Sequence, residues 1–550
     1  MSAITAQASE TPDSYGAFPR LTDDQVELLL ERGERRRTRA GDVLVREGAD
    51  SSELFVILQG RVAIVEGSGG PEERVIGVHG PGQFLGELNL LTGQASFTTA
   101  VVTEPGEVLA VPAASLRELA CQDPALGDVV LRACLLRRSL LLGLGSGLRI
   151  VGSRYSPDSR RLREFAARNR IPHAWTDLEE DDTAEALLRE LGVAPEEAPI
   201  VIWRGQQVLR NPTNAELGRL VGLRTEPSPG KVCDLVVVGA GPAGMAAAVY
   251  AASDGLDALV LDAIATGGQA ATASRIENYL GFPEGISGAE LADRALIQAR
   301  KFGAGISLPA EATGLGRRGA NHLVVLDDGE GFECRAVVIA TGARYRRLDV
   351  PRLEEFEKTS VYYAATPIEA QSCMGDPVAV VGGGNSAGQA TLFLSRYARN
   401  VYLVLREDEL TANMSRYLAD RIERSANVDV LRHSEIRELV GDKELESVVV
   451  EDDRTGERNE ITARALFVFI GADPCTGWLG DELELDDGGY IRTGAATGSA
   501  ALLETSRPGV FAAGDVRSGS AQRVASAVGE GAMAVRLVHE HLRQTYAAST

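Results

Sequence analysis

The chain has 550 residues, a length that predicts about three to five domains. Its 56 Lys and Arg residues against 78 Asp and Glu residues give a net charge of −22, which excludes bulk binding of nucleic acid or of an anionic membrane surface. Six cysteines without paired spacing indicate a reducing compartment, and the sequence shows neither metal-ligand spacing nor an uninterrupted apolar span, so we expect a cytoplasmic protein without a metal, nucleic-acid partner or membrane span.

The first predicted domain, residues 1–147, begins with an amphipathic helix at 23–32 and continues as short alternating runs separated by glycines. This pattern is typical of a small β-barrel or jelly roll. Three of its segments, 40–48, 54–60 and 84–88, resemble the cyclic-nucleotide-binding domains of bacterial regulators and kinases.

That resemblance implies that Gly86, Glu87 and Leu88 open a short helix that receives the cyclic phosphate and the ribose hydroxyl. The family also places an arginine about ten residues further on, where this chain reads Gln94-Ala-Ser-Phe-Thr-Thr99. Without that bidentate partner, phosphate binding is weakened. We therefore favour a domain that serves docking, dimerisation or another ligand, with cyclic nucleotide binding as the alternative.

The second predicted domain, residues 148–226, alternates strands and helices: strand 148–152, helix 160–169, strand 173–177, helix 183–191 and a strand after Pro199. This order resembles the α/β fold of thioredoxin and glutaredoxin, with Pro199 at the position of their cis-proline. The family's Cys-Pro-x-Cys is here Ser156-Pro157-Asp158-Ser159, and serine cannot form a disulfide. We expect a scaffold domain in which Ser159 caps a helix. The alternative is a turn that binds a thiol peptide or glutathione without turnover.

After a turn-rich linker at 224–231, a glycine fingerprint, Gly239-Ala-Gly241-Pro242-Ala243-Gly244, follows an apolar strand. Glycines at this spacing allow a tight turn, a close approach to a pyrophosphate and tight packing of the following helix. Asp262 ends the next apolar run 23 residues after Gly239, where an acidic side chain hydrogen-bonds a ribose. The pattern predicts a Rossmann-like dinucleotide-binding domain.

A second fingerprint, Gly382-Gly-Gly384-Asn385-Ser386-Ala387, follows the apolar run 378–381 and predicts a second Rossmann-like domain. At the position matching Asp262 stands Arg406, with Glu407 beside it. A cation there suits a 2′-phosphate and favours NADPH over NADH, although Glu407 weakens that preference.

Further motifs accompany the two fingerprints: Gly267-Gly268-Gln269, the segment 276–283, Ala340-Thr341-Gly342 and the segment 511–516. With them, roughly the last 320 residues resemble the low-molecular-weight thioredoxin reductase family. The resemblance implies a homodimer, an FAD-binding domain at 227–350 and 478–550, and an NAD(P)-binding domain at 351–477. It implies that FAD is lined by the first fingerprint and by Gly268, Gln269, Asn278, Thr341, Gly342, Gly514, Asp515, Arg523 and Val524.

The family's redox-active Cys-x-x-Cys is absent, because the matching positions read Ala364-Ala365-Thr366-Pro367. Cys373 is the cysteine nearest in sequence, and we interpret it as a buried small apolar residue. We therefore expect an enzyme that takes hydride from NADPH or NADH onto FAD and passes electrons to a protein or small-molecule acceptor other than a thiol. Two alternatives stay open: disulfide reduction through Cys373 or external thiols, and a flavin- or ligand-responsive sensor without turnover.

Overall fold

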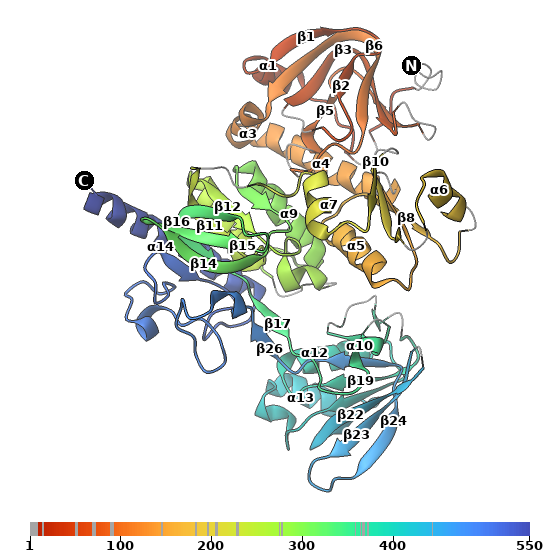
Figure 1. Ribbon diagram of the computed structural model, residues 1–550, viewed down its shortest axis with the longest axis vertical. Helices are drawn as coiled ribbons and strands as arrows, with labels where there is room; N and C mark the ends of the chain where they lie inside the picture. The colour runs from red at the N-terminus through yellow and green to blue at the C-terminus, as the bar shows by residue number, and fades with distance from the viewer. Residues whose placement is uncertain are drawn as a thin grey trace.

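The structure, a computed structural model, describes residues 9–13, 16–49, 53–68, 73–88, 93–144, 147–181, 184–194, 197–203, 207–226, 230–273, 276, 279–357, 359–363, 365, 369–370, 373–442 and 444–549. The chain forms successive domains, with the amino-terminal β domain, the middle α/β domain and the first dinucleotide-type domain packed together and the second dinucleotide-type domain set apart from them (Figure 1). Within the described residues, no helix is long and apolar enough to cross a membrane.

The amino-terminal domain is a six-stranded antiparallel sheet with strand order β1-β6-β3-β4, in which β2 pairs with β6 and β5 with β3. The alternating sequence pattern buries apolar side chains such as Leu54, Phe84 and Leu109 inside it. Two helices lead out of the sheet towards the rest of the chain. The elements are α1 (Asp23–Leu30), β1 (Glu34–Thr38), β2 (Val43–Val45), β3 (Glu53–Glu66), β4 (Arg74–His79), β5 (Phe84–Leu85), β6 (Thr99–Pro112), α3 (Ala113–Gln122) and α4 (Pro124–Leu144).

The middle domain has a four-stranded sheet of order β10-β9-β7-β8, in which β7 and β8 are parallel and β9 is antiparallel to β7. The Ala198–Pro199 peptide bond, directly before β9, is cis. The elements are β7 (Leu148–Gly152), α5 (Pro157–Arg168), β8 (His173–Asp177), α6 (Ala184–Glu190), β9 (Ile200–Trp203), β10 (Gln207–Arg210) and α7 (Asn214–Leu220).

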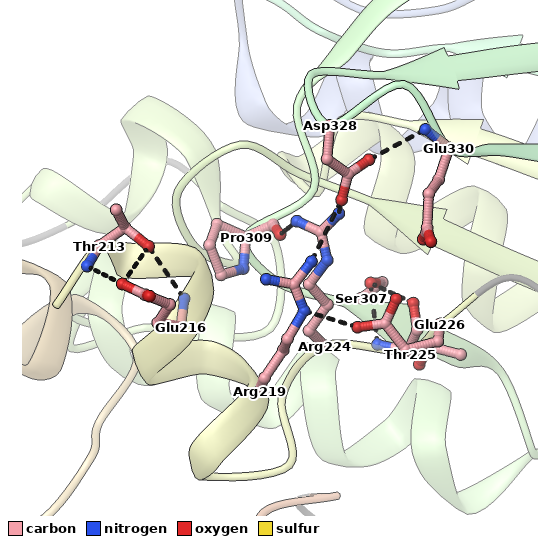
Figure 2. Close-up of polar contacts among 10 residues, drawn as sticks. All are labelled: Thr213, Glu216, Arg219, Arg224, Thr225, Glu226, Ser307, Pro309, Asp328 and Glu330. Carbon is pink, nitrogen blue, oxygen red and sulfur yellow. Dashed lines mark hydrogen bonds and ion pairs between the residues drawn. The ribbon is translucent and has the colours of Figure 1, made fainter. Parts of the chain in front are cut away.

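A buried arginine attaches the middle domain to the sheet that follows it (Figure 2). The Arg224 side chain, 1% exposed, donates to the carbonyl of Pro309 at 2.7 Å and pairs with Asp328. Arg219 of α7 pairs with the same Asp328 at 3.2 Å and with Glu226 at 2.7 Å. Arg224 is the buried member of this group, so its contacts tie the end of the middle domain to the neighbouring sheet, whereas the exposed Arg219 pairs add little.

The first dinucleotide-type domain contains a seven-stranded sheet of order β13-β12-β11-β16-β15-β14, with β27 paired to β16. Strands β13, β12, β11, β16 and β27 are parallel, and their near-continuous apolar runs match a sheet covered on both faces. The elements are β11 (Val232–Val238), α8 (Pro242–Ser253), β12 (Ala258–Leu261), a 3-10 helix (Gly268–Thr272), α9 (Gly288–Lys301), β13 (Gly305–Ser307), β14 (Ala312–Arg318), β15 (Asn321–Leu326), β16 (Gly331–Ile339), 3-10 helices (Gly477–Leu479 and Gly494–Thr497), β27 (Val510–Ala512) and α14 (Val524–Ser549).

The second dinucleotide-type domain has a parallel sheet of order β18-β25-β19-β20-β21 beside an antiparallel sheet of order β22-β23-β24. Strands β17 and β26, which pair with each other, carry the chain into and out of this domain (Figure 1). The elements are β17 (Ala343–Tyr345), α10 (Leu353–Phe356), β18 (Val361–Tyr362), β19 (Pro377–Val381), α12 (Asn385–Leu394), β20 (Asn400–Val404), a 3-10 helix (Leu410–Ala412), α13 (Arg416–Glu423), β21 (Val428–Leu431), β22 (Ser434–Gly441), β23 (Leu445–Asp452), β24 (Arg458–Thr462), β25 (Ala465–Val468) and β26 (Ala472–Pro474).

Candidate functional site

The first glycine loop joins β11 to α8, and two of its glycines are required by close backbone contacts. Gly239 has φ +107°, and a Cβ there would collide with the carbonyl of Ala340 at the end of β16. A Cβ on Gly244 would collide with the carbonyl of Gly239, so the helix packs closer to the strand than any other residue allows. These contacts match the roles that the sequence spacing predicts for the first and third glycines.

The middle glycine of the loop leaves room for a ligand. Gly241 is the N-cap residue of α8 and has no side chain to cap the helix, with Pro242 and Ala243 in the first turn. A Cβ on Gly268 would lie 3.0 Å from the Cα of Gly241, so the two loops nearly touch. The free N–H groups and positive dipole at this helix start therefore suit a pyrophosphate, and no other residue type at 241 or 268 preserves the same space.

Asp262, which the sequence assigns to a ribose, also organises the loop. Its carboxylate accepts backbone N–H bonds from Ala240 at 2.8 Å, Ile264 at 2.8 Å and Ala265 at 3.1 Å. Burial raises the pKa of Asp262, and the three hydrogen bonds oppose that rise. Because a carboxylate has about four lone-pair positions, one acceptor position remains for a ribose hydroxyl.

The segments after β16 and β27 close the other side of this site. The Thr341 hydroxyl donates to the carbonyl of Cys475 at 2.8 Å, and the Cys475 N–H donates to the carbonyl of Gly342 at 2.9 Å. A Cβ on Gly514 would lie 3.0 Å from the Cβ of Ala243, so this segment packs against the start of α8. Burial raises the pKa of the neighbouring Asp515 carboxyl.

Two segments remote in sequence, 268–269 and 514–515, thus meet the first loop at 239–244. Gln269 lies in the 3-10 helix at Gly268–Thr272 and Val524 begins α14. Asn278 lies outside the described residues. The geometry fits an extended dinucleotide whose pyrophosphate faces the start of α8.

The second glycine loop has the same backbone form but a more open setting. Gly382 has φ +136°, and a Cβ there would collide with the carbonyl of Phe469. Gly384 is the N-cap of α12, with open space where a Cβ would stand. The Asn385 side-chain oxygen accepts the Ser415 N–H at 2.7 Å and ties α12 to α13. The loop lines a cleft of about 900 Å³.

Residues from the first dinucleotide-type domain also line this cleft. Arg523, which the resemblance assigns to the flavin, stands in its wall with Gly382, Ser386 and Arg406. The cleft therefore reaches from the second loop to the segment before α14, which is the geometry required to bring a nicotinamide towards a flavin.

Two charged side chains border the second loop. The Arg406 side chain is 75% exposed and pairs with Glu435 at 2.6 Å. The Glu407 carboxylate is so close to the loop that a Cβ on Gly383 would lie 2.6 Å from one of its oxygens, and its other oxygen accepts from Asn413 at 2.8 Å. A carboxylate here suits ribose hydroxyls, whereas Arg406 suits a 2′-phosphate.

No described residue supplies a thiol pair beside either loop. Cys373 is 2% exposed, and its Sγ lies 3.1 Å from the carbonyl of Glu369. Burial raises the pKa of the Cys373 thiol to about 11. All six cysteines are free thiols. Of the positions that match the family's dithiol, Ala364, Thr366 and Pro367 lie outside the described residues, and the described part of the chain holds no cluster of metal-ligating side chains.

In the middle domain, the serine that caps α5 is Ser156, which accepts the Ser159 N–H at 3.3 Å. The expectation that Ser159 is the capping residue is therefore wrong: Pro157 occupies the first helical turn and moves the helix start forward. The Ser159 hydroxyl is buried instead, and a Cβ on Gly152 would lie 2.9 Å from Pro199.

The three residues that the sequence assigns to the ligand of the amino-terminal domain lie on a cavity of about 320 Å³. Gly86 has φ +95°, and a Cβ there would lie 2.6 Å from the carbonyl of Glu53. Glu87 is 1% exposed and pairs at 2.7 Å with Arg137 of α4. Sequence reasoning missed Arg137, although an arginine within an apolar helix was a usable signal.

Two separate parts of the chain match known protein families. Residues 233–531 match the family model for pyridine nucleotide-disulphide oxidoreductases, and residues 35–123 match the model for the cyclic nucleotide-binding domain. The expected multidomain arrangement of a cyclic-nucleotide-binding-type β domain and dinucleotide-binding α/β domains is therefore confirmed.

Several relatives are similar to the carboxy-terminal part of the chain. The "34.2 kDa protein in rubredoxin operon" of Clostridium pasteurianum is 36% identical over 57% of this chain and 98% of its own length. The thioredoxin reductase of Mycolicibacterium smegmatis is 36% identical over 55% of this chain and 94% of its own length. The Lactococcus lactis thioredoxin reductase structure (FR conformation) matches with a TM-score of 0.52 at 30% identity, over 57% of this chain and 99% of that one.

Proposed function

This chain belongs to the pyridine nucleotide-disulphide oxidoreductase family, and we propose that it is an FAD- and NAD(P)H-dependent oxidoreductase whose electrons leave by a route other than its own thiols. The observation that carries the proposal is the absence of a working thiol pair. The family's dithiol positions read Ala364 to Pro367, and the nearby Cys373 is a buried thiol with a raised pKa.

We assign FAD to the first loop and the segments around it, and the nicotinamide nucleotide to the cleft at the second loop. The close contacts at Gly241 and Gly268 support the first assignment, and the open cleft supports the second. The FAD residues are Gly239, Gly241, Pro242, Ala243, Gly244, Asp262, Gly268, Gln269, Asn278, Thr341, Gly342, Gly514, Asp515, Arg523 and Val524, and the nucleotide residues are Gly382, Gly384, Asn385, Ser386, Ala387 and Arg406.

When bound, a nicotinamide nucleotide would supply a hydride that FAD would accept, so no side chain of this chain has to act as an acid or base. The residues of this chain hold and orient the two dinucleotides. The amide groups at the start of α8 and α12 receive phosphates, Asp262 keeps the first loop in shape, and Arg406 attracts a 2′-phosphate. Arg523 comes from the FAD side of the chain and lines the nucleotide cleft, so it is placed to contact a nucleotide bound at the second loop.

Disulfide reduction is the second candidate, and the names of the relatives favour it. It would require Cys373 to act with an external thiol. Because a thiolate is the attacking species, a thiol with a pKa near 11 reacts slowly at neutral pH.

We also propose that the middle domain is thioredoxin-like and serves as a scaffold. Its β7-α5-β8-α6-β9-β10-α7 order and mixed sheet support the resemblance, and its two serines replace the redox sulfurs. A homodimer, which the thioredoxin reductase resemblance implies, is tested by measuring the mass of the purified protein in solution.

Reoxidation of the reduced protein tests the function. The yellow protein is bleached anaerobically with NADPH or NADH and then mixed with a quinone, with air, or with a disulfide such as oxidised thioredoxin. We expect rapid return of flavin absorbance with quinone or air and none with the disulfide. Equally rapid return with the disulfide would establish the second candidate, and failure to bleach with either nucleotide would indicate a sensor.

A further inference from the structure

The cavity of the amino-terminal domain contains buried polar atoms that have no hydrogen-bond partner in the described part of the chain. Glu87 uses one carboxylate oxygen to accept from Arg137 at 2.7 Å, while its Oε2 has no hydrogen bond. Arg137 is 6% exposed and donates to the carbonyls of Ala17 and Phe84, yet its Nη2 is also without a partner. Leaving such atoms unpaired is costly, so an unpaired acceptor and an unpaired donor on the same ion pair indicate a ligand position.

The other side chains that line the cavity indicate the chemical character of that ligand. Apolar side chains line most of it: Val45, Ile64, Ile76, Leu85 and Leu141. The charges of Glu87 and Arg137 cancel each other, and Arg138, which also lines the cavity, faces Asp293 at 3.6 Å. The segment where a cyclic phosphate would need an arginine supplies Gln94 and its uncharged neighbours. A ligand with a net charge would therefore meet only side chains that already face an opposite charge, whereas an uncharged ligand needs no counter-charge.

The next residue of α4, Arg138, faces the first dinucleotide-type domain. Arg138 is 4% exposed, faces Asp293 of α9 at 3.6 Å, and donates to the backbone carbonyl of Asn169 at 3.3 Å. Asp293, on another domain, also pairs with Arg170 at 2.7 Å, so the two arginines share this carboxylate. Adjacent residues of one helix therefore contact the cavity's ion pair and the first dinucleotide-type domain.

Asn169, at the end of α5 in the middle domain, forms hydrogen bonds with residues of both neighbouring domains. Its backbone carbonyl accepts from Gln94, a residue of the cavity wall, at 3.0 Å. Its side-chain Nδ2 donates to the carbonyl of Ile264 at 2.9 Å. The N–H of the same Ile264 donates to Asp262. A chain of hydrogen bonds thus runs from the cavity wall to the carboxylate that shapes the first glycine loop.

We propose that the cavity is an effector site for an uncharged molecule with an apolar body and a carboxamide-like edge, and that its occupant alters FAD binding through Asn169. The amide N–H₂ of the effector donates to Glu87 Oε2 and its carbonyl accepts from Arg137 Nη2. Shifts of Gln94 and Arg138 are passed to Asn169 and from there to the segment that holds Asp262. The second half of this inference rests on the assignment of FAD to the first loop.

Titration calorimetry on the full-length, FAD-loaded protein tests the ligand class. The probe is 2-naphthamide, compared with 2-naphthoate, which has the same shape with a negative charge, and with cyclic AMP. We expect the amide to bind and the carboxylate to bind at least about tenfold more weakly. Tighter binding of 2-naphthoate or of cyclic AMP, or no binding of the amide, would overturn the ligand class.

Two double variants locate the binding. Replacing the buried pair by apolar residues, Glu87→Met with Arg137→Leu, avoids leaving a lone buried charge and should remove amide binding. The matched change at the exposed pair of β3 and β6, Arg61→Leu with Glu104→Met, should leave it unchanged. Unchanged binding in the Glu87 and Arg137 variant would contradict the site.

The coupling is read from FAD release, followed by flavin fluorescence after dilution, with and without saturating 2-naphthamide. We expect the amide to change FAD affinity by about 5-fold or more, within the usual range of coupling between sites. Asn169→Ala, or the isosteric Asn169→Asp if the alanine variant does not fold, should keep amide binding and lose this change. Asn427→Ala, which removes an amide bonded to two carbonyls in another domain, is the control.

A change in FAD release that survives both Asn169 variants would overturn the route, and binding without any change in release would overturn the coupling. Failure of the FAD assignment itself is distinguishable, because amide binding in the calorimeter does not depend on where FAD binds.

Discussion

The two glycine loops share a backbone form and differ in what surrounds them. The first is enclosed by segments from three parts of the chain, with Gly268 and Gly514 packed against it. The second opens onto a cleft of about 900 Å³ bordered by the exposed Arg406. An enclosed loop suits a cofactor that stays bound, and an open one suits a nucleotide that enters and leaves at every turnover. The difference in surroundings thus supports our proposal that the same sequence pattern serves two kinetic roles.

The largest expected effect comes from placing a carboxylate at the middle glycine of each loop. Gly241 and Gly384 are both N-cap residues, with φ −69° and −89°. Aspartate is a favoured N-cap, so both helices should form normally. Gly241→Asp should weaken FAD binding more than ~100-fold, because it puts an uncompensated charge against the pyrophosphate, and yield a colourless protein.

Gly384→Asp is the matched control. This variant should remain yellow and lose reduction by NADPH and NADH. The measurement is the flavin content of each purified protein together with its bleaching by nucleotide. A yellow Gly241→Asp protein, or a colourless Gly384→Asp protein, would break the division of roles between the loops.

A second, smaller effect concerns which nucleotide the open loop prefers. Arg406→Gln should raise the KM for NADPH about tenfold and leave that for NADH nearly unchanged, because only NADPH carries the 2′-phosphate. Glu407→Gln should shift the preference in the opposite direction, since the carboxylate beside Gly383 repels that phosphate. Steady-state kinetics with both nucleotides measures this. An equal rise in the KM values for NADPH and NADH in Arg406→Gln would show that Arg406 does not bind the 2′-phosphate.

The smallest expected effect concerns Cys373, which precedes the strand leading to the open loop. Because its pKa is raised to about 11, its thiol is protonated at pH 8 and becomes reactive only as the pH approaches that value. Iodoacetamide should label the exposed Cys121 first at pH 8, as followed by peptide mass spectrometry. Cys373→Ser should change turnover less than about twofold. Rapid labelling of Cys373 at pH 8, with loss of disulfide reduction in the serine variant, would instead support disulfide reduction through Cys373.

The sequence predicted those features that depend on local pattern. Strands β7 and β8 have the bounds predicted for them, and Gly239 and Gly382 adopt the positive φ values that their turns require. Cys373 is buried, as interpreted from its neighbours.

Features that depend on the meeting of remote segments could not be predicted. Arg137 reaches Glu87 across 50 residues only because α4 lies against the β domain, and Asp262 binds three backbone N–H groups that no spacing rule specifies. The start of α5 was missed for a local reason, since Pro157 was not taken as a first-turn signal.

The most direct test of the central claim is the number of electrons that the reduced protein stores. Under anaerobic conditions, NADPH is added stepwise to the yellow protein until absorbance at 340 nm shows that further nucleotide remains unoxidised. A flavin alone accepts one hydride, whereas a flavin with a redox dithiol accepts two. We predict one NADPH per FAD, the same in wild type and in Cys373→Ser. Two equivalents in the wild type, falling to one in Cys373→Ser, would contradict the account and show that electrons do leave through a thiol.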